Sequence, residues 1–465
     1  MKTTVLFILP IIVLVLSSCS TKKSVDGIKV WEGSLDVHWN LDKPFDPELF
    51  DSLRAGDELV IGLEYTGSPW PIVALFDDKH MGMAGAGRWP IDESTTEISY
   101  NVTYDMNKTI HKSGVVLSGE GYTAKSIKII HHEPIDNIED ATWFGHVEMT
   151  PAWKRLVTLS QNTFANVDEG DILRFVMSDV TDTACFKLWT MQWTPMPNGL
   201  NGLNGKTDFE YAINHEAIEL LHRDGLLING TGFSLDRIEL KKPIWKGTEV
   251  VNWNNHIKVK IAPEVFKDVK VGDKLITCYG YIGDDEWPQI AFLDEDWHDI
   301  PGTGKILLYS IMNSCSLYVT QEMLDHIKSK GMYISGAGYI LKSLCVVKGD
   351  FEPYMKDAKW IGETKMTSDW NTVQRLSATC FTDANVGDIM RLSVSDVGVN
   401  AMISLRLGSW EMYEQIEGAR LSQNAKTYDY ELTDKLLRSI RENEGCVLFG
   451  TGYTLKAMHI VKKGE

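Results

Sequence analysis

The chain has 465 residues, enough for several domains, because one hydrophobic core usually serves about 100–200 residues. Its formal net charge of −18 disfavours nucleic acid and anionic lipid surfaces as partners, since phosphate binding needs clustered Lys and Arg. The acidic excess mainly indicates a well-solvated surface.

The N-terminus has the pattern of a secretory signal. Lys2 precedes an apolar run from Val5 to Leu16, which is too short for a permanent transmembrane helix. Leu16-Ser17-Ser18-Cys19 resembles the lipobox of bacterial lipoproteins, in which cleavage before the Cys leaves its thiol to carry diacylglycerol. We therefore expect residues 1–18 to be a signal peptide and residues 19–27 a linker lipidated at Cys19. The alternative is a cleaved peptide with an incidental Cys.

By resemblance to enterobacterial lipoproteins, Ser20 after the Cys favours sorting to the outer membrane. Surface-exported lipoproteins of glycan-degrading bacteria often carry an acidic run at this point, and residues 20–24 contain none. The expected location is therefore an outer-membrane lipoprotein, on either the periplasmic face or the cell surface.

Three landmarks then recur four times in one order, which predicts four copies of one module. Each copy opens with Trp-x-Gly, passes a Gly-Asp step and ends with Gly-x-Gly-aromatic. The openings begin at Trp31, Trp143, Trp245 and Trp360; the steps are Gly56-Asp57, Gly170-Asp171, Gly272-Asp273 and Gly387-Asp388; the endings begin at Gly119, Gly230, Gly336 and Gly450. The expected modules 1 to 4 span residues 28–136, 137–243, 244–353 and 354–465.

The four copies fall into two types. A second Trp follows the first after 8 residues in modules 1 and 3 (Trp39, Trp253) and after 10 in modules 2 and 4 (Trp153, Trp370). Modules 1 and 3 also share a Trp-Pro step, whereas modules 2 and 4 share a Ser-Asp-Val step. The order is A-B-A-B, so a two-module unit was duplicated, with a spacing of 217 residues from Trp143 to Trp360.

Each module is predicted to be an antiparallel β-sandwich. Residues 256–261 alternate apolar and polar side chains as a half-buried strand does, and the Gly-Asp steps precede apolar runs as turns do. One short segment per module looks helical, for example 320–327 with Thr320 as N-cap and Gly331 beyond its end, and we expect at most one helical turn. Many short strands with so little helix predict an all-β chain of four tandem sandwiches.

The recurring residues are interpreted as structural. The Gly-x-Gly ending predicts a tight backbone approach followed by a packed aromatic, and the opening Trp is expected in the core. The six cysteines beyond Cys19 do not recur at equivalent positions, so they indicate isolated small apolar residues, although a Cys380–Cys446 disulfide remains open.

Together, the Trp-x-Gly opening, the second Trp, the Phe shortly before the Gly-Asp step and the Gly-x-Gly-Tyr-Thr ending resemble the jelly-roll modules of carbohydrate-binding lipoproteins and multimodular glycosidases of bacterial polysaccharide-utilisation systems. The resemblance covers nearly the whole mature chain. It implies a jelly-roll-like fold and favours carbohydrate as ligand, although such sandwiches also serve as spacers.

Aromatic surface is the first feature expected of a sugar site, because an aromatic face meets the apolar face of a pyranose. Seven residues after an apolar strand residue, a Trp recurs in modules 2, 3 and 4, at Trp193, Trp297 and Trp410, and module 1 has His80 there. These tryptophans are predicted to bind glycan from a loop; the alternative is a rim residue that closes the sandwich.

Modules 1 and 3 add acidic residues to this region, and we expect an aromatic–acidic cluster in each. Its predicted members are Trp70, Asp77, Asp78 and Trp89 in module 1, and Trp287, Asp294, Asp296 and Trp297 in module 3. The alternative places Trp70 and Trp287 in the core, with the following Pro marking an edge or strand start.

No cofactor is expected, although structural calcium stays open. Two acidic runs, 284–286 and 294–296, could offer oxygen ligands, but they lack the spacing of a recognised calcium loop and suit solvated turns. No catalytic motif is present. A carboxylate pair for glycoside hydrolysis stays conceivable, but four small modules of one type favour no enzyme activity.

The sequence therefore predicts a lipid-anchored, non-catalytic glycan-binding protein with several weak sites that assists polysaccharide capture. Its expected partners are a polysaccharide or oligosaccharide, the membrane through the lipid anchor only, and no nucleic acid. The alternative is a structural, adhesive or assembly lipoprotein of the envelope that binds protein instead.

Overall fold

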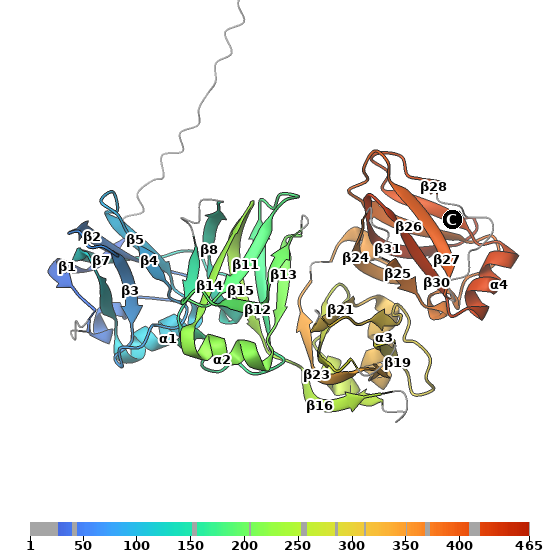
Figure 1. The fold of residues 1–465 in the computed structure, drawn as a ribbon, viewed down its shortest axis with the longest axis horizontal. Coiled ribbons are helices and arrows are strands. Elements are labelled where there is room, and N and C mark those ends of the chain that lie inside the picture. The colour runs from blue at the N-terminus through green and yellow to red at the C-terminus, as the bar shows by residue number, and fades with distance from the viewer. Residues whose placement is uncertain are drawn as a thin grey trace, which may run out of the picture.

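A computed structural model describes residues 27–39, 44–150, 156–203, 206–252, 258–283, 287–310, 313–349, 351–367, 373–408 and 419–464. These residues form four β-sandwich modules that follow one another along the chain (Figure 1). The predicted signal peptide, Cys19, the run 284–286, and the tryptophans at 153, 253, 370 and 410 lie outside the described residues.

Modules 1 and 3 each pair a four-stranded sheet with a second sheet. In module 1 the first sheet has the spatial order β1 (Ile28–Val37), β7 (Tyr122–Ile130), β2 (Glu58–Tyr65), β5 (Glu97–Asn101), and the second has β4 (Arg88–Pro90), β3 (Ile72–Phe76), β6 (Val116–Glu120). In module 3 the orders are β16 (Trp245–Val251), β23 (Tyr339–Val347), β18 (Lys274–Tyr281), β21 (Ser314–Tyr318), and β17 (Val259–Ile261), β22 (Met332–Ala337), β19 (Gln289–Leu293), β20 (Ile306–Leu307).

Modules 2 and 4 have the same arrangement. In module 2 the sheets are β8 (Ala141–Met149), β15 (Phe233–Lys241), β10 (Ile172–Ser178), β13 (Asp208–Ala212), and β9 (Val157–Leu159), β14 (Leu226–Thr231), β11 (Cys185–Trp189), β12 (Pro195–Gly202). In module 4 they are β24 (Trp360–Met366), β31 (Tyr453–Val461), β26 (Ile389–Ser395), β29 (Thr427–Glu431), and β25 (Val373–Leu376), β30 (Cys446–Thr451), β27 (Met402–Leu407), β28 (Ala419–Arg420).

The strand order makes each module a jelly roll. Counted along a module, strands 1-8-3-6 form the first sheet and strands 2-7-4-5 the second, and all pairs are antiparallel. In module 1 the second strand is reduced to a single bridge between Phe45 and Val115. The predicted fold class, four tandem antiparallel β-sandwiches, is therefore confirmed.

The Gly-x-Gly-aromatic ending joins strand 7 to strand 8. A Cβ on the first Gly would lie 1.9 Å from the Ile72 carbonyl oxygen in module 1 and 1.9 Å from that of Gln289 in module 3. Only glycine allows strand 7 to approach strand 4 so closely. The aromatic that follows is buried in all four modules, as predicted: Tyr122, Phe233, Tyr339 and Tyr453.

The Trp-x-Gly opening forms a bulge in strand 1. In each module the Gly and the residue after it are left out of the regular pairing between strand 1 and strand 8. The pairing passes from Glu32 to Leu35 in module 1 and from Ile361 to Thr364 in module 4. The Trp ring covers the Gly, where a Cβ would come within 2.2 Å of the Trp360 ring in module 4. Each of the four opening tryptophans packs on its own core, and the predicted core position is confirmed.

Each Gly-Asp step forms a buried turn before strand 3, and its Asp side chain bonds a residue that follows strand 8. The Asp57 carboxylate accepts a 2.7 Å hydrogen bond from the Arg54 amide and a 2.8 Å bond from His131 Nδ1, just after strand 8. In the other modules a Lys after strand 8 takes the place of the His, at Lys242, Lys348 and Lys462. Burial alone would raise the pKa of the Asp57 carboxyl, but the bonds from His131, Arg54 and His132 outweigh it and lower that pKa.

One α-helix follows strand 6 in every module. The four helices are α1 (Tyr104–Ser113), α2 (His215–Asp224), α3 (Gln321–Lys330) and α4 (Asp434–Glu442). The predicted N-cap is confirmed, because the Thr320 hydroxyl accepts the Met323 amide at 3.2 Å, and Gly331 ends α3. The predicted length is wrong: nine or ten residues make nearly three turns, not one.

Neighbouring modules touch through packed surfaces. Modules 2 and 3 share a small apolar cluster made of Ile172, Ala212, Ile276, Cys278, Cys345 and Val347. Beside it the Ser343 hydroxyl donates to the Gly170 carbonyl at 2.7 Å. Cys380 and Cys446 are separate buried thiols, so the disulfide that the sequence left open is not formed.

Candidate functional site

The loop after strand 4 is built in the same way in three modules. His80, Trp193 and Trp297 occupy equivalent places and have φ angles of 56°, 62° and 69°. Left-handed backbone is costly for a bulky side chain, so the recurrence of this conformation at the predicted sugar-binding position in three modules requires an explanation.

One side chain at the start of each loop organises this turn. The Asp77 Oδ1 atom accepts the backbone amides two and four residues further on, at 3.0 and 2.9 Å, and Asp294 Oδ1 does the same at 2.9 Å for both. In module 2 the Thr190 hydroxyl takes this role at 3.2 Å. The two predicted carboxylates therefore support the loop that carries the aromatic residue.

In module 2 the loop presents a pair of indole rings, the module 2 platform. Trp193 is 50 % exposed, and its ring lies 6.2 Å from that of Trp189 with an interplanar angle of 55°. Trp189 stands on the outer face of the second sheet, and its Nε1 donates to Asn229 Oδ1 at 3.2 Å. The two rings form a tilted aromatic surface, and the Asn229 amide bonded to Trp189 is itself buried.

In module 3 the corresponding surface, the module 3 platform, combines aromatic rings with a cation. Trp297 is 42 % exposed, and the Lys258 ammonium lies 4.6 Å from its ring centroid. The same ammonium lies 4.6 Å from the ring of Tyr333, which is on the outer face of β22. These distances suit cation–π contacts.

The outer faces of modules 1 and 4 carry related groups. In module 1 the rings of Trp39 and Phe76 lie 6.4 Å apart, and the Arg88 guanidinium lies 5.5 Å from the Trp39 ring. In module 4 the Arg406 guanidinium lies 5.1 Å from the Phe449 ring. Trp410, the predicted site residue of module 4, is outside the described residues.

The structure separates Trp70 and Trp287 from the other members of the predicted aromatic–acidic clusters, while Asp294, Asp296 and Trp297 share one loop. Trp70 and Trp287 precede strand 4, whereas Asp77, Asp78, Asp294, Asp296 and Trp297 follow it. Strand 4 has five residues in both modules, so about 16 Å of strand separates the two groups. Trp70 and Trp287 are 82 % and 65 % exposed, which excludes the core position left open for them.

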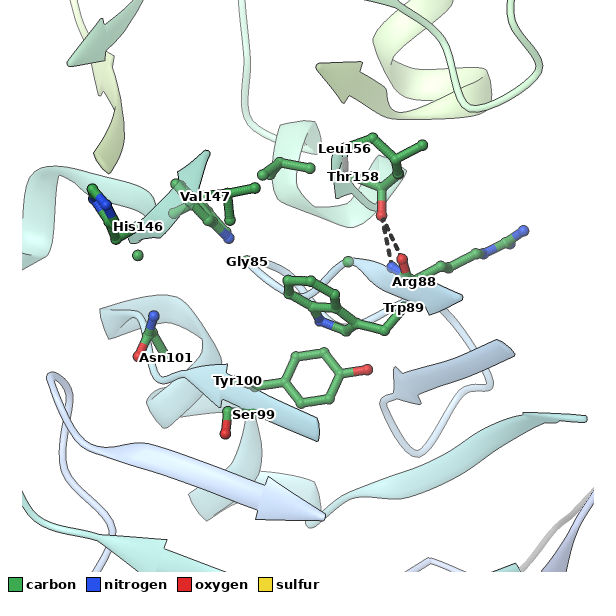
Figure 2. Close-up of a pocket in the computed structure, with 14 residues that line it drawn as sticks. Gly85, Arg88, Trp89, Ser99, Tyr100, Asn101, His146, Val147, Leu156 and Thr158 are labelled. Atoms are coloured by element: carbon green, nitrogen blue, oxygen red, sulfur yellow. Dashed lines mark hydrogen bonds between the residues drawn. The ribbon is translucent and has the colours of Figure 1, made fainter. Parts of the chain in front are cut away.

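The predicted residue Trp89 lies in a different setting, between modules 1 and 2. It lines a cavity of about 130 Å³ with Tyr100, whose ring lies 6.4 Å away, edge-on (Figure 2). Thr158 of module 2 closes another side, because its hydroxyl accepts the Arg88 amide at 2.7 Å. Trp89 is thus half-buried at the junction, away from the loop of His80.

A carboxylate–imidazole group is the one set of potential metal ligands found among the described residues. Ligand atoms of Asp294, Asp296 and His298 lie within 4.8 Å of one another. One Asp294 oxygen already holds the loop amides, and imidazole is not a usual calcium ligand. The set therefore fits calcium poorly.

Sequence reasoning missed Trp39, Trp189, Tyr333 and Lys258 as surface groups. One signal was present for Trp189: Phe186 and Leu188 are apolar neighbours two residues apart, so period two places Trp189 on the opposite, outer face. Nothing in the local pattern around Lys258 indicates that it bridges two rings.

No protein-family model and no curated protein match this chain. One matching solved structure is the Bacteroides ovatus mixed-linkage glucan utilization locus protein SGBP-B in complex with a mixed-linkage heptasaccharide. The match has 15 % identity and a TM-score of 0.21, and covers 36 % of this chain and 48 % of that chain. This chain therefore aligns with about half of that protein's length, and a superposition this weak shows neither a shared site nor a shared ligand.

Among the described residues, no helix is long and apolar enough to cross a membrane.

Proposed function

We propose that this protein is a non-catalytic glycan-binding lipoprotein, anchored through Cys19 to the outer membrane, and that its outer sheet faces capture polysaccharide. One observation carries the proposal: Trp193 and Trp297 are about half exposed although their backbone is left-handed.

That conformation costs free energy, and the ring contacts inside each module, to Trp189 in module 2 and to Lys258 in module 3, leave about half of each indole exposed. Bulky residues in sparsely populated regions cost of order 1–3 kcal/mol each and persist mainly at functional sites. A glycine at either position would form the same turn without the cost. The exposed part of each indole is the surface that an external partner would contact.

A pyranose is a suitable partner for these surfaces. Its apolar face stacks on an indole, and its hydroxyls accept or donate hydrogen bonds to nearby polar groups. In the module 3 platform the Lys258 ammonium lies beside the Trp297 and Tyr333 rings and can donate to a sugar hydroxyl. The module 2 platform offers its two indole rings, because the Asn229 amide bonded to Trp189 is buried.

Repetition of the module supports capture of long chains. A polysaccharide that occupies one platform raises the effective concentration of its own next segment at another, so weak sites reinforce each other. In the loop that carries Trp297, the Asp294 carboxylate supports the turn, and this favours binding over hydrolysis.

Affinity gel electrophoresis against neutral polysaccharides such as xylan, mannan, starch and mixed-linkage β-glucan tests the proposal. The double variant Trp193→Ala/Trp297→Ala should lose retardation by at least about tenfold in apparent affinity, equivalent to about 1.4 kcal/mol. Tyr104→Ala is the control, because Tyr104 is an exposed aromatic on α1, away from the platforms.

Unchanged retardation in the double variant would reject the platforms as the binding surface. A melting temperature lowered by many degrees would assign both rings to packing instead.

A protein-binding role is the second candidate, favoured by Trp70 and Trp287. Both are more exposed than the platform tryptophans and lie at the opposite end of strand 4. Trp70→Ala/Trp287→Ala should abolish co-purification of an envelope protein and leave glycan retardation intact if this role is correct. Loss of glycan retardation in that variant would instead make these residues part of the glycan site.

A further inference from the structure

A second, larger cavity lies where modules 2, 3 and 4 meet. Its volume is about 640 Å³, within the range of about 300–1,000 Å³ typical of small-ligand sites. Its walls come from β13 of module 2, β18, β20 and β21 of module 3, and β24 and β25 of module 4. Neither Trp193 nor Trp297 lines it.

This cavity is the duplicated counterpart of the one in Figure 2. All 14 residues that line the smaller cavity have an equivalent on the wall of the larger one, 217 residues later, as with Ser99 and Ser316. The fold of the A–B unit therefore makes a hollow at each A–B junction.

The two hollows differ in their linings and in size. Trp89 and Tyr100 of the first are replaced by the smaller Ile306 and Leu317 in the second, while Asn101 and Thr158 are replaced by the larger Tyr318 and Arg375. Module 2 then adds a third wall, residues 206–210 apart from Thr207, which has no equivalent at the first junction. The first junction thus holds a cavity of about 130 Å³, whereas the second, with its added wall, holds a compartment of about 640 Å³.

The floor of the compartment is a charged network that joins modules 2 and 3. The Lys274 side chain is 8 % exposed, and its ammonium bonds Glu210 and lies 3.3 Å from Asp208 and 5.2 Å from the Tyr318 ring centroid. Burial raises the pKa of the Glu210 carboxyl, and Lys274 opposes that rise. Buried ion pairs are costly to maintain, and a hydrophobic floor would hold the modules together as well.

The walls carry charges of both signs, which suits a neutral, hydroxyl-rich ligand. An anion would meet the carboxylates of Asp208, Glu210 and Glu363, and a cation would meet Lys274, Lys305 and Arg375. A sugar hydroxyl can donate to the former and accept from the latter, while Tyr318 and Tyr309 offer rings. Tyr309 is 55 % exposed and Ser316 is exposed as well, so the compartment is open to solvent at these two residues.

We propose that the compartment between modules 2, 3 and 4 is a separate binding site for a short neutral oligosaccharide. It differs from the platforms in that it encloses its ligand instead of offering a flat surface. It does not require that the platforms bind glycan.

Isothermal titration calorimetry of the full soluble chain with a panel of neutral trisaccharides (cellotriose, maltotriose, xylotriose and mannotriose) at millimolar concentration tests this site. We expect at least one trisaccharide to bind with a stoichiometry of one. Ser316→Trp, which fills the compartment from an exposed strand position, should weaken that binding by at least about tenfold.

Two further variants keep the test decisive. Tyr309→Ala removes a rim ring and should weaken binding even if Ser316→Trp folds poorly, whereas Ser99→Trp, the same change at the equivalent exposed position of the first junction, should bind like the wild type. The platform variant Trp193→Ala/Trp297→Ala should keep its trisaccharide affinity while losing polysaccharide retardation.

The proposal is overturned if no trisaccharide binds the wild type, or if binding survives both Ser316→Trp and Tyr309→Ala. Loss of trisaccharide binding in the platform variant would also overturn it, because the platforms would then be the site. None of these results affects the polysaccharide retardation on which the proposed function depends.

Discussion

The left-handed loop residues lead to a sharp test of strain, in which Trp193 is changed once to Ala and once to Gly. Both variants lose the indole. Only the Gly variant also loses the backbone cost, because alanine at a φ of 62° still places a Cβ against the backbone.

The expected difference can be estimated from that conformation. Left-handed backbone costs roughly 1–2 kcal/mol for a residue with a Cβ and almost nothing for glycine. Glycine gives back part of this gain through the greater freedom of the unfolded chain, about 0.4–1 kcal/mol. Trp193→Gly should therefore be more stable than Trp193→Ala by about 0.5–1 kcal/mol.

The assay is thermal melting of the two variants side by side. A gain of about 1 kcal/mol corresponds to about 2–8 °C, depending on whether module 2 unfolds alone or with its neighbours. Gln192 provides the control from the same loop, because it is exposed and is not among the residues with positive φ. There the order should reverse, with Gln192→Ala melting above Gln192→Gly.

If Trp193→Gly melts at or below Trp193→Ala, the backbone is not strained, and an external partner is no longer needed to explain the Trp. The same pair of variants at Trp297, where φ is 69°, repeats the test in module 3.

Three other outcomes are expected. Gly336→Ala should unfold module 3 or destabilise it by more than about 3 kcal/mol, because the alanine Cβ would lie 1.9 Å from the Gln289 carbonyl oxygen. A normal melting temperature would mean that strands 4 and 7 can separate at this position. Because the pKa of Asp57 is lowered in the folded protein, its ionised carboxylate stabilises the fold above about pH 4, and this stabilisation is lost as the pH falls further. The melting temperature should therefore decline less steeply from pH 5 to 3 in Asp57→Asn than in the wild type, and equal slopes would contradict this. Cys19→Ala should leave the protein unprocessed or released from the membrane fraction, and a correctly processed, membrane-bound variant would disprove the lipid anchor.

Backbone requirements could be predicted from the sequence because they are local. The first Gly of each ending faces a neighbouring carbonyl, and the opening Trp covers its own Gly, so each motif repeats wherever the strand pair repeats. The helices were underestimated because their apolar signal is thin: α1 buries only Met106 and Ile110, and α3 only Met323 and Ile327. Their extent depends on contact with the sandwich, which short windows of sequence do not carry.

The candidate sites were harder to predict because they depend on direction and assembly. Spacing along the chain placed Trp70 and Asp77 in one cluster, but an extended strand holds them about 16 Å apart. Tyr333 and Lys258 come from different strands and meet only in the folded sheet. The compartment around Lys274 exists only where three modules meet, so no single repeat contains its pattern.

The close junctions also fix the spacing between modules, and this bears on the proposed capture of polysaccharide. Modules 2 and 3 share the apolar cluster around Ile172 and Cys345, and the Ser343 hydroxyl is bonded to the Gly170 carbonyl, which resists rotation of one module against the other. The module 2 and module 3 platforms are therefore held at a constant separation, unlike sites on flexible tethers. A linear polymer whose repeating unit matches that separation can occupy both platforms without bending. Selectivity for such a polymer can thus come from its periodicity as well as from the chemistry of its sugars.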